Sequence, residues 1–252
     1  MFQPDHLMTF RLFSYSHIAA LMVFLMTLII MIYSFQKWKN QRGEKIIGWI
    51  LLSLLVGSEV FYQLWAISYG VWDSRETLPL HLCSFSTFFG IYLFFKRNNV
   101  LFYFYFYIGF FPPILALVTP DLLFEFPHFR YFKFFIHHMA IPLMAVYLLL
   151  TKKYILSIKS IVYGLLTLNL MILPIGLINK WIGSNYFFLA GPPEGDTALS
   201  FFGEGIMYFI NLEFAAFILF FISFLCSKGI TKFQSKLDRD GVRKHDEQDK
   251  IS

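Results

Sequence analysis

Tyr15–Phe35 reads YSHIAALMVFLMTLIIMIYSF and contains no charged side chain. A helix needs about 20 apolar residues to cross the ~30 Å hydrocarbon core of a bilayer, so this stretch predicts a transmembrane helix. Six further stretches are similarly apolar: Ile46–Ile67, Leu78–Phe95, Val100–Val118, Phe134–Leu150, Ile161–Ile178 and Ile206–Cys226. The sequence therefore predicts an all-α, polytopic membrane helix bundle of about seven transmembrane helices.

The composition supports a lipid-facing protein. Of the 252 residues, 57% are hydrophobic and only 15% are charged, whereas a soluble domain carries about 25% charged residues. The apolar residues come in long blocks, which indicates one transmembrane domain over residues 1–226. The polar tail over residues 227–252 has no apolar periodicity, so we expect it to be disordered in the cytoplasm, with its basic residues near anionic lipid head groups.

The positive charges predict the orientation in the membrane. If the seven segments alternate, 16 of the 21 Lys and Arg residues fall on the side that holds the carboxyl terminus. Basic residues accumulate in cytoplasmic loops, so the amino terminus is expected outside and the carboxyl terminus inside. The formal net charge of +5 is thus explained by topology and does not indicate nucleic acid as a partner. We expect a multi-pass protein of the cell membrane.

Two cysteines are too few for a disulfide framework. Cys83 and Cys226 are also expected near opposite faces of the bilayer. Both are therefore predicted to be free thiols.

The polar residues of the predicted spans collect in one layer. Ionisable groups inside a membrane are costly and face a bundle interior or a water-filled cavity. The expected topology places this set in the outer half of the bundle, with nothing comparable in the inner half: His17, Glu59, Gln63, His81, Cys83, His137, His138, Asn211 and Glu213. The layer predicts a functional cavity on the non-cytoplasmic side.

Helical geometry limits which of these groups can act together. His81 and Cys83 are two residues apart, so in a regular helix they point to nearly opposite faces. A histidine that serves Cys83 is then expected from another helix, and His137 and His138 lie at a similar depth. Pro79 suits a first helical turn, where unpaired amides favour a thiolate. The plainer interpretation is that Cys83 packs as a small apolar residue and that the histidines make interhelical hydrogen bonds.

Three motifs resemble one known family. The stretch Leu78–Ser84, LPLHLCS, is preceded by Glu59 and Trp65 and resembles the YwaF-like bacterial integral membrane family. Phe134–His138, FFIHH, is similar to the aromatic–histidine motif of that family. Asn185–Leu189, NYFFL, followed by Gly-Pro-Pro, is similar to its Asn-Tyr loop before the last helix. The resemblance extends over most of the chain, from the second to the seventh predicted helix.

That family is in turn similar to eukaryotic multi-span proteins implicated in acyl transfer to ether phospholipids, whose proposed nucleophile is the cysteine of this motif. The resemblance implies that Cys83 is the nucleophile and His138 the base, although the doubled histidine leaves His137 as an alternative. Membrane phospholipids would be the partners. We expect no cofactor and no metal.

The leading hypothesis is an intramembrane acyltransferase or lipid hydrolase. The Cys83 thiolate would attack an ester carbonyl of a lipid that enters laterally, with a histidine moving the proton. Glu59 or Glu213 would orient that histidine, and Asn185 or amides near Pro79 would stabilise the oxyanion. The remaining residues expected to bind substrate are His81, Tyr186 and Gln63.

Two other classes of function stay open on the sequence. Glu59 and Glu213 could carry protons in a transporter, flippase or channel. Alternatively, His17, His81 and His138 could bind a metal or haem from separate helices. The sequence lacks CxxC, HxxxH and CxxCH spacings, which weakens the metal interpretation.

Overall fold

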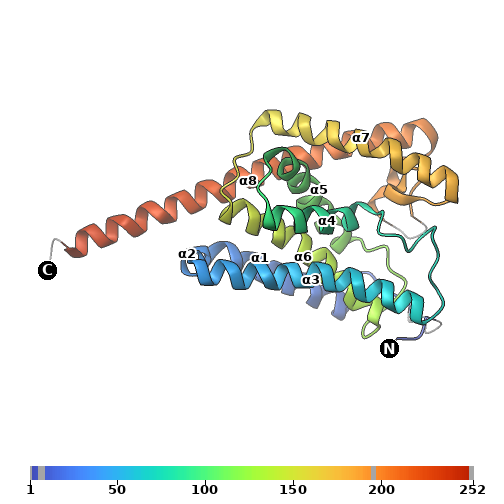
Figure 1. The fold of residues 1–252 in the computed structure, drawn as a ribbon, viewed down its shortest axis with the longest axis horizontal. Coiled ribbons are helices and arrows are strands. Elements are labelled where there is room, and N and C mark those ends of the chain that lie inside the picture. Colours follow the sequence, from blue (N-terminus) through green and yellow to red (C-terminus); the bar gives the residue numbers. More distant parts are fainter. Residues whose placement is uncertain (1, 5–8, 194–196, 250–252) are drawn as a thin grey trace.

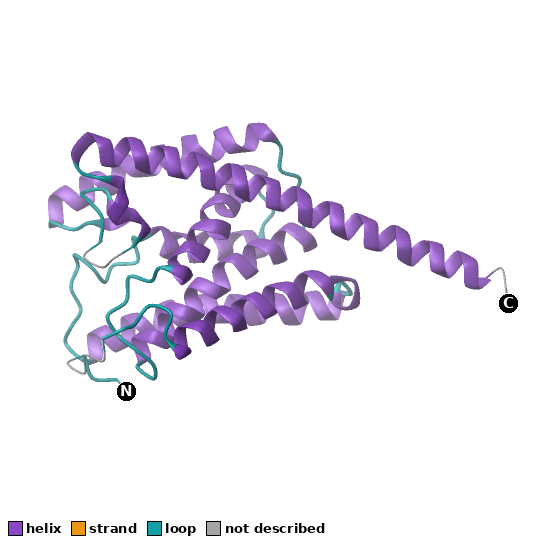
Figure 2. Ribbon diagram, turned by 180° about the vertical axis from the view of Figure 1, so that it is seen from behind, coloured by secondary structure: helices purple, strands orange, loops and turns teal. Residues whose placement is uncertain are grey.

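The computed structural model describes residues 2–4, 9–193 and 197–249, with side chains as far as Asp240. These residues form a helical bundle without a β-sheet (Figure 1, Figure 2). Its helices are α1 (Tyr15–Tyr33), α2 (Phe35–Trp38), α3 (Gln41–Ser68), α4 (Leu82–Phe95), α5 (Asn99–Val118), α6 (Phe129–Thr151), α7 (Ile158–Ile182), the 3-10 turns η1 (Tyr186–Phe188) and η2 (Ala198–Phe202), and α8 (Gly205–Asp249). The predicted all-α class is confirmed.

In the described part of the chain, six helices are long and apolar enough to cross a membrane, namely α1, α3, α5, α6, α7 and α8. The chain is therefore a multi-pass membrane protein. Its sidedness stays a prediction.

Helix α6 forms the centre of the bundle together with α5. Every residue of α6 from Ala140 to Leu150 is buried, as expected for a helix that is apolar on all sides and surrounded by others. Helix α5 packs along α6 and also contacts α4, α7 and α8. In Figure 1, α1 and α3 lie on one side of this central pair, and α7 and α8 lie on the other. The core is rich in aromatic side chains because α5 contributes Phe104–Phe110 to it, all buried.

Helix α4 is shorter than the sequence predicts. The segment expected from Leu78 becomes helical only at Leu82, and its 14 residues are about 21 Å long. His81 is the N-cap, with extended backbone angles of φ −70° and ψ 154°. Pro79 therefore does not lie in a first helical turn, and the argument that His81 and Cys83 occupy opposite faces of one helix does not apply.

Helix α6 starts earlier than expected, at Phe129 and not at Phe134. His128 caps it, because its Nδ1 accepts a hydrogen bond from the Arg130 N–H at 3.1 Å. His137 and His138 consequently lie about 12 Å along the helix from its first residue, and not at its opening.

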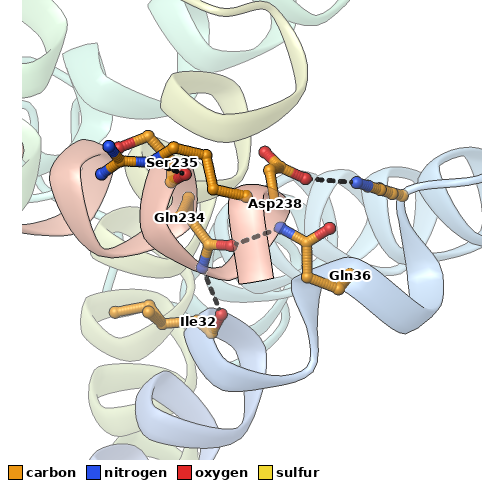
Figure 3. A network of polar contacts seen from close by, with 7 residues as sticks. Ile32, Gln36, Gln234, Ser235 and Asp238 are labelled. Carbon is orange, nitrogen blue, oxygen red and sulfur yellow. Dashed lines mark hydrogen bonds and ion pairs between the residues drawn. The ribbon is translucent and has the colours of Figure 1, made fainter. Parts of the chain in front are cut away.

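Helix α8 runs without interruption to Asp249, and so through residues 227–249 of the segment predicted to be a disordered tail. Residues 250–252 of that segment lie outside the described part of the chain. The helix extends well beyond the bundle (Figure 1). Near the start of this extension it is joined to α1 and α2 by polar contacts (Figure 3): Gln234 Nε2 donates to Ile32 O at 2.5 Å and Gln36 Nε2 donates to Gln234 Oε1 at 3.1 Å. Lys39 forms an ion pair with Asp238 at 2.7 Å. These contacts give the helical continuation a tertiary partner.

Glu125 joins the start of α1 to the loop between α5 and α6. Its carboxylate accepts hydrogen bonds from the Ser16 hydroxyl, from the Arg11 N–H at 3.0 Å and from the Phe126 N–H at 3.1 Å. A carboxylate at a helix amino terminus is also favoured by the helix dipole. Partial burial acts to raise the pKa of Glu125, but the hydrogen bonds outweigh it and hold the pKa below its ordinary value.

This lowered pKa predicts acid-sensitive anchoring of α1. A carboxyl whose folded-state pKa lies below its unfolded-state pKa stabilises the fold above the unfolded value and loses that contribution as the pH falls through the folded value. We expect Glu125→Gln to melt below the wild type at pH 7 and the difference to shrink below about pH 4. Thermal melting of the detergent-solubilised pair from pH 7 to pH 3 tests this. A constant difference across that range would contradict it.

Candidate functional site

His137 connects three helices at the end of the bundle that carries the amino terminus. Its ring is 1% exposed. Its Nε2 lies 3.3 Å from the main-chain oxygen of Cys83, and its Nδ1 lies 2.7 Å from Ser58 Oγ. A carbonyl oxygen only accepts, so Nε2 carries the proton, and Nδ1 of the neutral ring accepts from the Ser58 hydroxyl. The single proton of that hydroxyl is shared with Leu55 O, at 2.9 Å. Both nitrogens are occupied, which leaves His137 without a free atom to act as a base.

His138 has the opposite arrangement. Its Nδ1 lies 2.8 Å from the main-chain oxygen of Phe134, one turn earlier, and its ring stacks on that phenylalanine with centroids 4.1 Å apart. The carbonyl fixes the proton on Nδ1, so Nε2 holds a lone pair. No hydrogen bond reaches Nε2 from the described residues. Of the two adjacent histidines, His138 is the one with a free basic nitrogen.

Cys83 lies in the first turn of α4, half-buried. Its thiol makes no hydrogen bond with any residue that the structure describes, so the direct thiol–histidine pair expected from the sequence is not formed in this conformation. The first helical hydrogen bond of α4 runs from the Phe85 N–H to His81 O at 3.1 Å, and the His81 side chain makes no capping bond. The N–H groups of residues 82–84 are therefore free of described acceptors, as at any uncapped helix start.

Glu59 holds the same helical turn from α3. The carboxylate is 8% exposed, and its Oε2 accepts a hydrogen bond from the Ser84 hydroxyl at 3.3 Å. Its Oε1 lies 3.5 Å from Gln63 Nε2. It forms no hydrogen bond with His137 or His138, so the expected orienting role is not seen. Glu59 instead positions the residue that follows Cys83.

The side chain of Gln63 forms hydrogen bonds with the loop between α3 and α4. Its Nε2 donates to Thr77 O at 2.7 Å, and its Oε1 accepts from Trp72 Nε1 at 3.0 Å. The side chain was expected to bind substrate. The structure shows that it attaches this loop to α3.

Tyr186 forms a wall beside His81, with the two rings edge to face and their centroids 4.9 Å apart. Its hydroxyl accepts from the Leu78 N–H at 3.0 Å and donates to Ser74 O at 2.8 Å. Burial raises the pKa of Tyr186 to about 12, although the hydrogen bond from Leu78 opposes this. The phenol therefore stays a donor at neutral pH, and it fixes the extended segment that precedes α4.

Asn185 makes its side-chain hydrogen bonds within its own loop. Its Nδ2 donates to Gly191 O at 3.0 Å, and its Oδ1 accepts from the Ala190 N–H at 2.8 Å. These bonds shape the turn before α8. They leave no support for Asn185 as the stabiliser of an oxyanion.

Several residues of the predicted layer lie apart from this cluster. Glu213 on α8 accepts a hydrogen bond from Asn169 on α7 at 3.3 Å, and α8 packs mainly on α5 and α7. Asn211 Nδ2 donates to Phe202 O at 3.0 Å. The prediction that Glu213 works beside Cys83 was based on depth alone, and the order of the helices around the bundle separates the two.

His17 is a satisfied structural histidine at the start of α1. Its Nδ1 accepts from the Phe13 N–H at 3.0 Å, and its Nε2 donates to Leu117 O at 2.8 Å. In the described part of the chain, no three His, Cys, Asp or Glu side chains gather as a metal site would require. His17, His81 and His138 are thus not brought together as ligands.

Three residues near the cluster were not singled out from the sequence: Ser58, Arg130 and Lys133. The two cations lie over the Tyr62 ring, with the Arg130 guanidinium carbon 4.7 Å and Lys133 Nζ 4.5 Å from its centroid. Arg130 also donates to the Tyr62 hydroxyl at 2.9 Å. Residues 130, 133 and 137 follow the three- and four-residue spacing of one helical face. This spacing could have been recognised in the sequence if the helix had been predicted to begin at Phe129.

The Ser58–His137 bond is expected to contribute to stability. Ser58→Ala leaves His137 Nδ1 buried without a partner, which should cost about 1 kcal/mol. We expect a lower melting temperature for Ser58→Ala than for Ser53→Ala, which removes an exposed hydroxyl from the same helix. Equal melting temperatures for the two variants, measured in the same detergent, would show that the bond carries no net stability.

Comparison with known proteins identifies the family. No curated protein and no solved structure matches the chain. One family model does, that of the TMEM164 family, and it covers residues 12–224. This range includes α1, the His81–Ser84 turn, both histidines of α6 and most of the apolar part of α8. The chain belongs to the TMEM164 family.

Proposed function

We propose that the protein is a cysteine-dependent phospholipid acyltransferase or lipid hydrolase whose site lies at the start of α4. One observation carries the proposal. Cys83 lies in an uncapped first helical turn, and His138, whose Nε2 is free, is adjacent in sequence to the histidine of α6 that bonds this turn. The same helix fixes the position of the turn, because His137 donates to the Cys83 carbonyl.

The chemistry follows from these groups. After side-chain rotation, His138 Nε2 takes the thiol proton, and the Cys83 sulfur attacks the carbonyl carbon of a lipid ester. The carbonyl oxygen becomes an oxyanion that accepts hydrogen bonds from the free N–H groups at the start of α4. Collapse breaks the ester C–O bond, and His138 returns its proton to the departing alcohol. The acyl group remains on Cys83 as a thioester.

The second half-reaction regenerates the enzyme. A lipid hydroxyl or water gives its proton to His138 Nε2 and attacks the thioester carbonyl. The C–S bond breaks and the sulfur regains a proton from His138. Transfer to a lipid hydroxyl yields a new phospholipid, and transfer to water yields a fatty acid.

His137 and Glu59 are positioning residues in this proposal. His137 holds the Cys83 carbonyl, and Glu59 holds the hydroxyl of Ser84. The LPLHLCS motif, similar to YwaF-like proteins and through them to the eukaryotic acyl-transfer proteins, supports the same nucleophile. Phospholipids of the cell membrane are the proposed partners.

The proposal predicts the loss of turnover on removal of either reactive group. Purified protein in vesicles should convert phospholipid with a labelled acyl chain into labelled transfer product or fatty acid. Cys83→Ala should abolish this, and His138→Gln should lower the rate by about 10²–10⁴-fold. Cys226→Ala is the matched control, since this second thiol lies on α8, and it should retain the wild-type rate.

Two results would contradict the proposal. Full turnover by Cys83→Ala and His138→Gln would remove the mechanism. Movement of labelled lipid across the vesicle without product, sensitive to Glu59→Gln but not to Cys83→Ser, would instead indicate a transporter or flippase.

A further inference from the structure

A groove of about 210 Å³ runs between α3 and α6 on the outside of the bundle. Its walls include Leu54, Gly57 and Phe61 from α3, and Phe132 and Ile136 from α6. Phe61 is 62% exposed and Ile136 39% exposed, on two helices that span the membrane. The groove therefore opens toward lipid and presents an apolar lining to it.

The dimensions of the groove suit a lipid chain. Its α3 wall extends from Ser53 to Phe61, about 12 Å along the helix axis. Its volume is below the roughly 300–1,000 Å³ of pockets for compact small molecules. An apolar groove of this length between two membrane-spanning helices fits a segment of one acyl chain.

The α6 wall of the groove carries positive charge. Lys133 lines it, and Arg130 lies one turn nearer to the start of α6. Both cations lie over the ring of Tyr62. Two cations on one aromatic ring repel each other unless an anion joins them.

No described carboxylate contacts either cation directly. Among the described residues neither cation forms an ion pair within 4.0 Å. Glu59 acts on Lys133 electrostatically, but its hydrogen bonds go to Ser84 and Gln63. A planar guanidinium beside an ammonium is an arrangement that binds phosphate oxygens.

We propose that this groove binds one anionic phospholipid, with an acyl chain along Gly57 and Phe61 and the phosphate on Lys133 and Arg130. Charge and shape agree on this occupant, because Lys133 and Arg130 lie in the first two turns of α6 and the apolar lining continues from them toward the middle of α3 and α6. The site goes beyond the proposed acyl transfer and does not require Cys83. It adjoins that chemistry through Ser58, which lines the groove and bonds His137.

The test uses full-length Cys83→Ala protein in detergent, so that acyl transfer cannot contribute. Phosphatidylglycerol and phosphatidylcholine with identical diazirine-labelled chains are cross-linked separately, and the modified peptides are mapped. We expect phosphatidylglycerol to label α3 and α6 more than phosphatidylcholine does. Lys133→Gln should reduce this preference roughly fivefold. Lys180→Gln, which removes an exposed cation near the end of α7, is the control and should keep it.

A second variant tests the apolar part of the site. A Cβ on Gly57 would meet only the Phe61 ring, at 3.7 Å, so Gly57→Leu should be tolerated and should fill the groove. We expect it to abolish labelling of α3 and α6 by both lipids, while the melting temperature stays near that of its parent.

Other outcomes would overturn the proposal. An unchanged phosphatidylglycerol preference in Lys133→Gln, or unchanged labelling in Gly57→Leu, would remove the lipid from the groove. Complete displacement by soluble glycerol phosphate would show an anion site in which the groove takes no part. Binding that persists in Cys83→Ala alongside a failed turnover assay would leave this inference standing and reject the acyl-transfer proposal alone.

Discussion

The geometry of the candidate site depends on one buried histidine, both of whose ring nitrogens are hydrogen-bonded. His137 reaches from α6 to a hydroxyl on α3 and to the main-chain oxygen of Cys83 on α4. An unpaired polar atom at this depth would cost free energy, so the three helices are held in one register by a requirement to satisfy both ring nitrogens. Glu59 repeats the arrangement from α3 through Ser84. The first turn of α4 is thereby fixed at two consecutive residues.

Occupation of His137 gives its neighbour a different role. The two imidazoles are adjacent in sequence and differ in the groups that their nitrogens meet. The carbonyl of Cys83 on the neighbouring helix α4 takes the Nε2 proton of His137, whereas the carbonyl of Phe134 in the preceding turn of α6 takes the Nδ1 proton of His138. The same residue type is a structural donor in one position and a base with an open lone pair in the next. Of the two adjacent histidines, His137 thus positions the first turn of α4, and His138 keeps a nitrogen that can react.

Hydropathy was sufficient to predict the bundle, because a bilayer imposes a length and a composition on every span. The sequence also grouped Cys83, Glu59 and His137, and in the structure His137 and Glu59 both bond the turn that holds Cys83. What depth cannot give is the order of helices around the bundle, and for that reason Glu213 was expected beside a cluster from which α8 is separated by α5.

The sequence also could not predict the hydrogen-bond partners of the polar residues in and near the loops. Gln63, Asn185 and Tyr186 have polar side chains that suit a substrate, but each satisfies backbone groups of an irregular segment. Such partners are set by the path of the loop, which the sequence does not specify. Lys133 was overlooked for a simpler reason. Placing the start of the helix at Phe134 made it a loop charge, although it lies on the same helical face as His137.

The short length of α4 has a consequence for access. Its start is set back from the end of α3 in Figure 1, and the extended residues before it rest on Tyr186. Non-helical backbone at membrane depth persists only where protein covers it or a cavity adjoins it. No turn of α4 precedes the half-buried thiol of Cys83, so a rearrangement of these extended residues, without unwinding of α4, would change which molecules can reach it.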